Sequence, residues 1–262
     1  MIFPKQTRLS LYPVFLSVAL SVTSFLQGQT ADGDFLLHLD FRKQLPVQTA
    51  EGDSLESVIV NGTQPKFSES AGALIFDSNS WKAGFLRLAG TENAATLAGA
   101  TDALTISALV KLAPSSGDSK IAGAKQALVS RIDAKEKAGW FFGNYVSGKL
   151  LFFWARENGT AVIRMTKAAL FRPGEWHRVS VVWKTDDMNG LSFFVDGYPA
   201  DSMVGERVVR AKGTATIPAD KRPITIGATD DGRYPFRGEI RDVRIYNRAL
   251  SAGELLKLSL NN

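Results

Sequence analysis

The segment GEWHRVSVVWKTDDMNGLSFFVDGYPA, residues Gly174–Ala200, has the pattern of a β-hairpin. Side chains alternate between the two faces of a strand, so His177, Val179, Val181 and Trp183 share one face of the first run. Leu191, Phe193 and Val195 share one face of the second run. The polar stretch Asp186–Gly190 separates these two runs. Asp196-Gly197 supplies the positive φ that a two-residue turn requires. The segment therefore predicts two antiparallel strands closed by a tight turn.

The rest of the chain repeats this pattern in short apolar runs separated by turn residues, without long amphipathic helices between them. The runs are Phe35–Phe41, Ala73–Phe76, Gly84–Leu88, Leu104–Leu112, Ala127–Arg131, Gly139–Tyr145, Lys149–Arg156, Ala161–Thr166, Ile224–Gly227 and Glu239–Tyr246. Many short strands with regular turn signals predict an all-β fold, an antiparallel two-sheet sandwich. One short C-terminal helix is expected after Ser251, because Ser251-x-x-Glu254 matches a capping box.

The first 30 residues have the pattern of a secretory signal peptide. Lys5 and Arg8 precede an apolar run, Leu11–Leu26, and Gln27–Ala31 is polar and small. These features predict a signal peptide at residues 1–30, cleaved at about 28–31, and one domain at residues 31–262. The alternative is an uncleaved membrane anchor, for which the run is short. The prediction is a secreted, periplasmic or cell-envelope protein without a membrane span after cleavage.

Composition excludes several classes of site. The chain has no Cys and 2 His, which excludes thiol catalysis and classical zinc sites. Its formal net charge of +5 is spread along the chain and argues against nucleic acid as a partner.

Several motifs together resemble the laminin-G-like, concanavalin A-like lectin/glucanase family. Besides the hairpin, Leu104–Leu112, Ala127–Arg131 with Gly139-Trp140, and above all the ending Phe236–Ser251 carry the resemblance. It implies a jelly roll whose last strand returns beside the first. It also suggests a bacterial envelope or extracellular setting. Because lectins, adhesion modules and glycoside hydrolases share this fold, the resemblance does not determine the function.

Arg241 departs from the family pattern. Many relatives carry at this position an acidic residue that ligates a structural Ca²⁺, which an arginine repels. Arg241 is two and four residues before Val243 and Ile245, so it is expected on the same face of the strand as these core residues. We therefore expect its guanidinium to be buried and paired with Asp34 or Asp40. The alternative is a side chain that reaches solvent at the rim. No cofactor is expected, and structural Ca²⁺ is doubtful.

One acidic motif has the spacing that the resemblance associates with retaining β-glucanases, Glu-x-Asp-x-x-Glu. It occurs as Glu51, Asp53 and Glu56, but the intervening Gly52 and Ser54 are poor strand formers. We interpret it as a coincidence in a polar loop, and we predict that the protein is not an enzyme. A Ser/His/Asp site is also not expected, because His177 belongs to the structural hairpin.

The aromatic residues around Ser147-Gly148 suggest a binding surface. If this dipeptide is a two-residue turn, Tyr145 pairs with Leu150 and Phe141 with Trp154. One face then holds Trp140, Phe142, Asn144, Leu151 and Phe153 and lines the core. The other holds Phe141, Tyr145, Leu150, Phe152, Trp154 and Arg156, of which we predict as ligand-binding residues Phe141, Tyr145, Trp154 and Arg156.

Two alternatives to this surface stay open. The aromatic residues can instead fill the sheet beneath a covering loop, and a one-residue slip in register would exchange the two faces. The loop Asp230–Tyr234 is expected at a sheet rim, either as a partner contact or as a solvated turn.

The combined hypothesis is an exported, non-catalytic binding module that recognises carbohydrate or a cell-surface protein. The alternatives are a glycoside hydrolase of the same fold and a structural subunit of a larger surface assembly. The sequence leaves the natural ligand and the oligomeric state open.

Overall fold

The hairpin predicted from Gly174–Ala200 forms as β12 (Trp176–Lys184) and β13 (Leu191–Val195) in the computed structural model. Val179 pairs with Val195 and Val181 with Phe193, and Asp196 at the turn has a φ of 53°. The structure describes residues 35–43, 47–49, 56–60, 65–77, 84–89, 103–114, 125–132, 139–145, 147–155, 161–184, 190–204 and 223–261. The predicted signal peptide and its cleavage site lie outside these residues.

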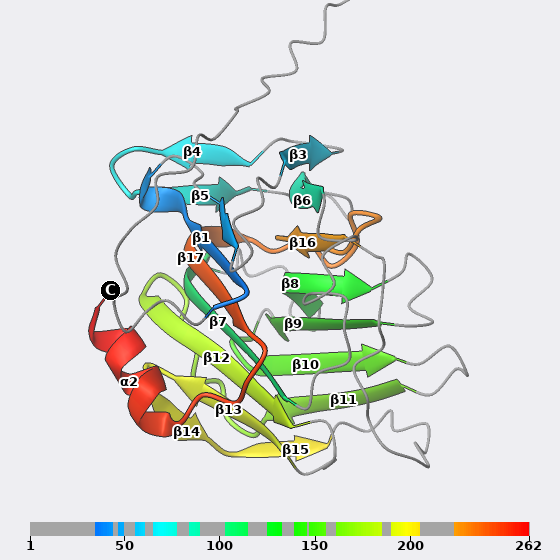
Figure 1. Cartoon of the computed structure of the whole chain (residues 1–262), viewed down its shortest axis with the longest axis vertical. Helices are drawn as coiled ribbons and strands as arrows, with labels where there is room; N and C mark the ends of the chain where they lie inside the picture. The colour runs from blue at the N-terminus through cyan, green and yellow to red at the C-terminus, as the bar shows by residue number, and fades with distance from the viewer. Residues whose placement is uncertain are drawn as a thin grey trace, which may run out of the picture.

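The described strands form two antiparallel sheets that face each other (Figure 1). Sheet A has the order β14 (Tyr198–Ala200), β13, β12, β7 (Ala103–Leu112), β17 (Gly238–Tyr246), β1 (Leu37–Asp40) and β2 (Val47–Thr49), with β5 (Ala73–Phe76) on β17 and β4 (Lys66–Ser68) on β5. Sheet B has the order β15 (Ser202–Val204), β11 (Ala161–Thr166), β10 (Leu150–Ala155), β9 (Gly139–Tyr145), β8 (Lys125–Ile132), β16 (Ile224–Ile226), β6 (Phe85–Ala89) and β3 (Glu56–Val60). A short 3-10 helix, η1 (Phe41–Lys43), follows β1.

The first and last described strands lie side by side, as predicted. Leu37 of β1 pairs with Ile245 of β17, and Leu39 pairs with Val243. These four side chains point inward and are buried with the alternate apolar residues of both sheets. Closing the sheet in this way covers strand edges that would otherwise expose unpaired backbone groups. The two-sheet antiparallel sandwich expected from apolar alternation is confirmed.

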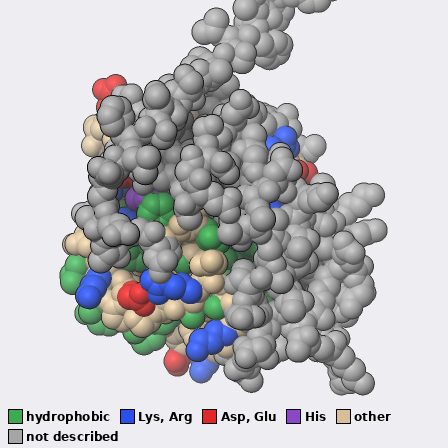
Figure 2. All heavy atoms as spheres, in the orientation of Figure 1, with side chains coloured by type: hydrophobic (Ala, Val, Ile, Leu, Met, Phe, Trp, Pro, Cys, Tyr) green, Lys and Arg blue, Asp and Glu red, His purple; other side chains and the backbone are tan. Residues whose placement is uncertain are grey.

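The C-terminal helix α2 (Ala252–Leu260) packs on the outer side of sheet A, the side away from sheet B (Figure 1). Its Leu255 and Leu258 cluster with Val182, Phe194 and Tyr246 of the sheet. Charged side chains of both signs lie beside hydrophobic ones over this part of the surface (Figure 2). Among the described residues, no helix is long and apolar enough to cross a membrane.

The predicted capping box starts α2. The Ser251 hydroxyl accepts a hydrogen bond from the Glu254 amide at 3.3 Å, and the Glu254 carboxylate accepts one from the Ser251 amide at 2.8 Å. These bonds to Ser251, together with Arg248, lower the pKa of Glu254 from 4.5 to about 2. The carboxylate is partly exposed, so solvent screening keeps its contribution to stability small.

Ser251→Ala is expected to lower the free energy of unfolding by about 1 kcal/mol, because the first turn of α2 loses its acceptor. Since the pKa of Glu254 is lowered, its contribution is present above pH 4.5 and is lost as the pH falls through about 2. Urea unfolding followed by circular dichroism measures both effects. Ser259→Ala, in the same helix, is the matched control and should change stability by less than about 0.5 kcal/mol. An equal loss in both variants would contradict the capping assignment.

Candidate functional site

The aromatic hairpin of sheet B has a register one residue away from the predicted one. Asn144 pairs with Leu150 and Trp140 with Trp154, whereas the prediction paired Tyr145 with Leu150 and Phe141 with Trp154. The predicted pairing is therefore wrong. The cause is the connection, which is longer than a two-residue turn: the Tyr145 amide bonds to the Lys149 carbonyl at 2.8 Å, and Gly148 adopts a φ of 84°.

This register separates the predicted ligand-binding residues. Trp154 is 3% exposed and lies between the sheets, with its ring centroid 5.6 Å from that of Trp183. Phe141 and Tyr145 point to the outer side of sheet B, where Phe153 joins them in place of Trp154. Arg156 lies outside the described residues. The structure thus brings Phe141 and Tyr145 to one face and removes Trp154 from it.

An aromatic stack occupies this outer side of sheet B. The Phe141 ring lies 5.2 Å from Phe153 and 5.5 Å from Tyr234, nearly parallel to both. The Lys125 ammonium lies 5.6 Å from the ring centroids of both Phe153 and Tyr234. We call the set Lys125, Phe141, Tyr145, Phe153 and Tyr234 the aromatic face. Its two phenylalanines are buried, and its tyrosines and lysine are half-buried.

Tyr234 reaches this stack through an unusual backbone conformation. Its φ is 53°, a left-handed value that bulky side chains rarely adopt. Its carbonyl accepts a hydrogen bond from the Ala127 amide at 2.7 Å, next to a bulge of β8. Strained residues of this kind persist where the surrounding structure holds them, and they are concentrated at functional sites. The loop expected at the rim thus packs onto the sheet through Tyr234.

Charged pairs border the aromatic face. Arg87 of β6 donates to the Asp230 carboxylate at 2.6 Å, and Asp231 accepts hydrogen bonds from Thr229 and Arg233. Burial acts to raise the pKa of Asp231, but the hydrogen bonds and the Arg233 charge outweigh it and lower the pKa below 3.8. Burial raises the pKa of Tyr145 above 10, so its hydroxyl stays protonated and can both donate and accept.

This arrangement combines apolar rings with fixed polar groups. Such a surface can stack on a sugar ring and exchange hydrogen bonds with its hydroxyls. No group of three or more His, Asp or Glu side chains among the described residues could hold a metal ion. Glu51 and Asp53 of the acidic motif lie outside the described residues, as does the side chain of Glu56 at the start of β3.

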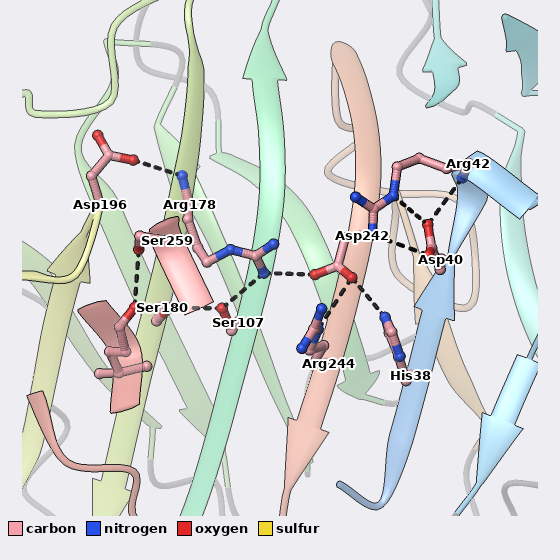
Figure 3. Close-up of polar contacts among 11 residues, drawn as sticks. His38, Asp40, Arg42, Ser107, Arg178, Ser180, Asp196, Asp242, Arg244 and Ser259 are labelled. Atoms are coloured by element: carbon pink, nitrogen blue, oxygen red, sulfur yellow. Dashed lines mark hydrogen bonds and ion pairs between the residues drawn. The ribbon is translucent and has the colours of Figure 1, made fainter. Parts of the chain in front are cut away.

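A buried charge network crosses the outer side of sheet A, on the opposite side of the sandwich (Figure 3). Asp242 of β17 is 0% exposed and accepts from Arg178 at 2.6 Å, from His38 at 2.7 Å and from Arg244 at 3.2 Å. Burial alone would raise the pKa of Asp242, but the His38 hydrogen bond and the two arginine charges hold it well below its usual range. Ser107 of β7 accepts a further hydrogen bond from Arg178.

This network was not among the sites predicted from the sequence. The sequence pattern that could have indicated it is alternation along the strands. Arg178 alternates with the core residues of β12, and Asp242 and Arg244 are two apart on the last strand, so each lies on the outer face. That pattern also describes an ordinary solvated face. The network forms because β7, β12, β17 and β1 are neighbours in sheet A.

The expected internal pairing of Arg241 is wrong. β17 has a bulge between Ile240 and Asp242, which shifts the alternation by one residue and turns Arg241 away from Val243 and Ile245. Arg241 instead donates to the Ala71 carbonyl from Nε at 3.1 Å and Nη2 at 2.9 Å, while its guanidinium carbon lies 4.2 Å from the Trp176 ring centroid.

The two expected partners of Arg241 have other positions. Asp40 accepts hydrogen bonds from Arg42 at 2.8 Å and 3.1 Å, and Asp34 lies outside the described residues. Although burial opposes it, the Arg42 interaction lowers the pKa of Asp40. The replacement of Ca²⁺ by an arginine stays a prediction.

Solved structures with this fold include binding domains of botulinum neurotoxins. The botulinum neurotoxin serotype G binding domain aligns with a TM-score of 0.60 at 12% identity, over 87% of this chain and 51% of that one. A binding domain of botulinum neurotoxin DC in complex with rat synaptotagmin II aligns at 0.54 and 15% identity, over 87% and 51%. Botulinum neurotoxin type C, whose uptake into cells is dependent upon interaction with two ganglioside molecules, aligns at 0.55 and 13% identity, again over 87% and 51%.

These likenesses concern the fold alone, and the chain spans about half the length of those structures. No curated protein sequence matches it. The family match is more direct, because it covers residues 89–256, from the end of β6 into α2, and includes the hairpin and the ending that suggested it. The chain belongs to the laminin G group of the Concanavalin A-like lectin/glucanases superfamily.

Proposed function

We propose that the protein is an exported, non-catalytic module that binds carbohydrate through the aromatic face. The proposal rests on the position of Tyr234. Its left-handed backbone holds the ring against Phe141, and the Lys125 ammonium lies over the same ring. A ring fixed before binding loses little conformational entropy when a ligand packs on it.

The surrounding groups support a sugar as the ligand. Tyr145 and Tyr234 offer flat apolar area with a polar hydroxyl, and Lys125 offers N–H donors beside the same rings. The arginine-bound carboxylates Asp230 and Asp231 add oriented acceptors at the border. Ganglioside molecules and rat synaptotagmin II are the partners named for botulinum neurotoxins of the same fold, so a protein ligand is the alternative outcome.

Asp231 is not suited to act as the general acid of a glycoside hydrolase at this face. A retaining or inverting glycosidase needs one carboxyl group with a raised pKa, which serves as the general acid. Asp231 has a lowered pKa because Thr229 and Arg233 stabilise its charged form. It is suited to accept hydrogen bonds and not to donate a proton.

Tyr234→Gly is expected to weaken saccharide binding by about tenfold, within the range for loss of one aromatic contact and one hydrogen bond. Glycine adopts the left-handed conformation without strain, so this variant removes the ring while preserving the loop. A glycan array identifies a saccharide, and isothermal titration calorimetry then compares the affinities.

Tyr198→Ala serves as the matched control, because Tyr198 is 67% exposed on β14 of the other sheet. It should leave the affinity unchanged. A folded protein that binds no saccharide on the array, or whose affinity is the same after Tyr234→Gly, would overturn the proposal. Binding of a surface protein without saccharide affinity would favour the alternative.

A further inference from the structure

A row of side chains crosses the outer side of sheet A, on the opposite side of the sandwich from the aromatic face. The register of five neighbouring strands places these residues side by side, in the order Lys66 (β4), Ile75 (β5), Glu239 (β17), Lys111 (β7) and Trp176 (β12). Strands lie about 4.8 Å apart, so this row is about 19 Å long. Its length suits an extended polymer better than a single small molecule.

Arg241 is added to this row by the bulge in β17. A bulge leaves one extra residue outside the ladder and re-aims its side chain. Here the extra residue places a guanidinium 4.2 Å from the Trp176 ring centroid, and the Lys111 ammonium lies 5.6 Å from the same centroid. Two cations from different strands thus approach one half-buried indole.

The guanidinium is held but not neutralised. Its Nε and Nη2 bond to the uncharged carbonyl of Ala71, and within the described residues Arg241 forms no ion pair and its Nη1 no hydrogen bond. Lys66 is exposed and likewise forms no ion pair there, whereas Lys111 bonds to Glu239 at 2.6 Å. Arg178 and Arg244 differ from Arg241, because both pair with the buried carboxylate of Asp242.

The nearby exposed acids do not cancel this charge. Glu175, next to Trp176, lies 3.9 Å from Arg172, and Glu69, in the β4–β5 turn, makes no ion pair with Arg241. A guanidinium oriented by stacking and by two hydrogen bonds loses little entropy when it binds an oxyanion. Its planar N–H groups match the paired oxygens of a carboxylate or sulfate.

We propose that Arg241, Trp176 and Lys111 form a second binding site, for the carboxylate or sulfate groups of an acidic polysaccharide that runs along the row towards Lys66. The anionic group bonds to Arg241 Nη1 and the Lys111 ammonium, and the adjoining sugar packs against the edge of Trp176. This site is independent of the aromatic face, because the two lie on opposite sides of the sandwich.

Isothermal titration calorimetry with polygalacturonate, dextran sulfate and neutral dextran tests the site. Binding of at least one acidic polymer but not of dextran is expected. Arg241→Gln should weaken that binding by about tenfold or more, the value of a hydrogen bond to a charged group. Polygalacturonate alone would identify a carboxylate as the ligand, and dextran sulfate alone would identify a sulfate.

Lys184→Gln is the matched control, since it removes one exposed cation from the other end of β12. It should change the affinity less than twofold. Lys111→Gln should also weaken binding. Because this substitution leaves the Arg241–Ala71 bonds in place, it replaces Arg241→Gln as the test if that variant proves unstable. Tyr234→Gly should have no effect on acidic polymers, which separates this site from the aromatic face.

Three results would overturn the proposal: no binding of either acidic polymer, equal losses in Arg241→Gln and Lys184→Gln, or an affinity for neutral dextran that equals the affinity for the acidic polymers and persists in Tyr234→Gly. Equal losses would mean general attraction of a polyanion to a basic protein.

Discussion

Asp242→Asn is expected to lower the free energy of unfolding by about 3–5 kcal/mol, as removal of one partner from a buried ion pair does. Asp242 is 0% exposed and balances Arg178 and Arg244, which are 2% and 4% exposed. Asparagine has the same shape but no charge, so the buried ionic interaction with both guanidinium groups would be lost. Guanidinium chloride unfolding of the purified protein measures the change.

Glu239→Gln is the control for this substitution. Glu239 lies on β17, as Asp242 does, and forms an ion pair with Lys111 of β7, but its carboxylate is partly exposed. Its loss should be about 1 kcal/mol or less. If Asp242→Asn costs no more than Glu239→Gln, the network does not stabilise the sandwich as the structure indicates.

The same network predicts a pH dependence with a definite sign. The pKa of Asp242 is lower in the folded protein than its ordinary 3.8, so the folded state favours the charged form. The stability that it contributes is therefore present above pH 3.8 and is lost as the pH falls below that value. The difference in stability between the wild type and Asp242→Asn should shrink over this acidic range.

Trp154→Ala is expected to lower the free energy of unfolding by about 3–5 kcal/mol, the range for truncation of a large buried aromatic residue. The ring is 3% exposed and packs against Trp183 between the sheets, so its removal leaves a cavity. Trp154→Phe fills part of this space and should cost less. Thermal and denaturant unfolding measure both variants.

Tyr198→Ala is again a suitable control, since an exposed tyrosine should contribute less than about 0.5 kcal/mol. A Trp154→Ala protein with wild-type stability that has lost only saccharide affinity would contradict the observed register. It would instead favour the pairing of Phe141 with Trp154 that the sequence suggested.

In sheet B, apolar alternation predicted the two faces correctly within one strand but not across a loop. Within β9, alternation correctly assigned Phe142 to the core and Phe141 to the outer side. Across the connection to β10 the assignment failed, because one additional loop residue exchanges every side chain of the second strand between the faces. Trp154 was therefore expected outside, where Phe153 lies.

The sequence by itself determined the all-β sandwich, the central hairpin, the adjacency of the terminal strands and the capped C-terminal helix. Each of these depends on periodicity or on turn and cap residues within a few positions of one another. Only the tertiary structure decided the β9–β10 register, the direction of Arg241 and the partners of Asp242. The His38–Asp242 bond joins residues 204 positions apart, and the Arg178–Asp242 bond joins residues 64 apart. Which strands become neighbours, and where a bulge shifts their pairing, depends on packing of the whole sandwich, which no local pattern of residues contains.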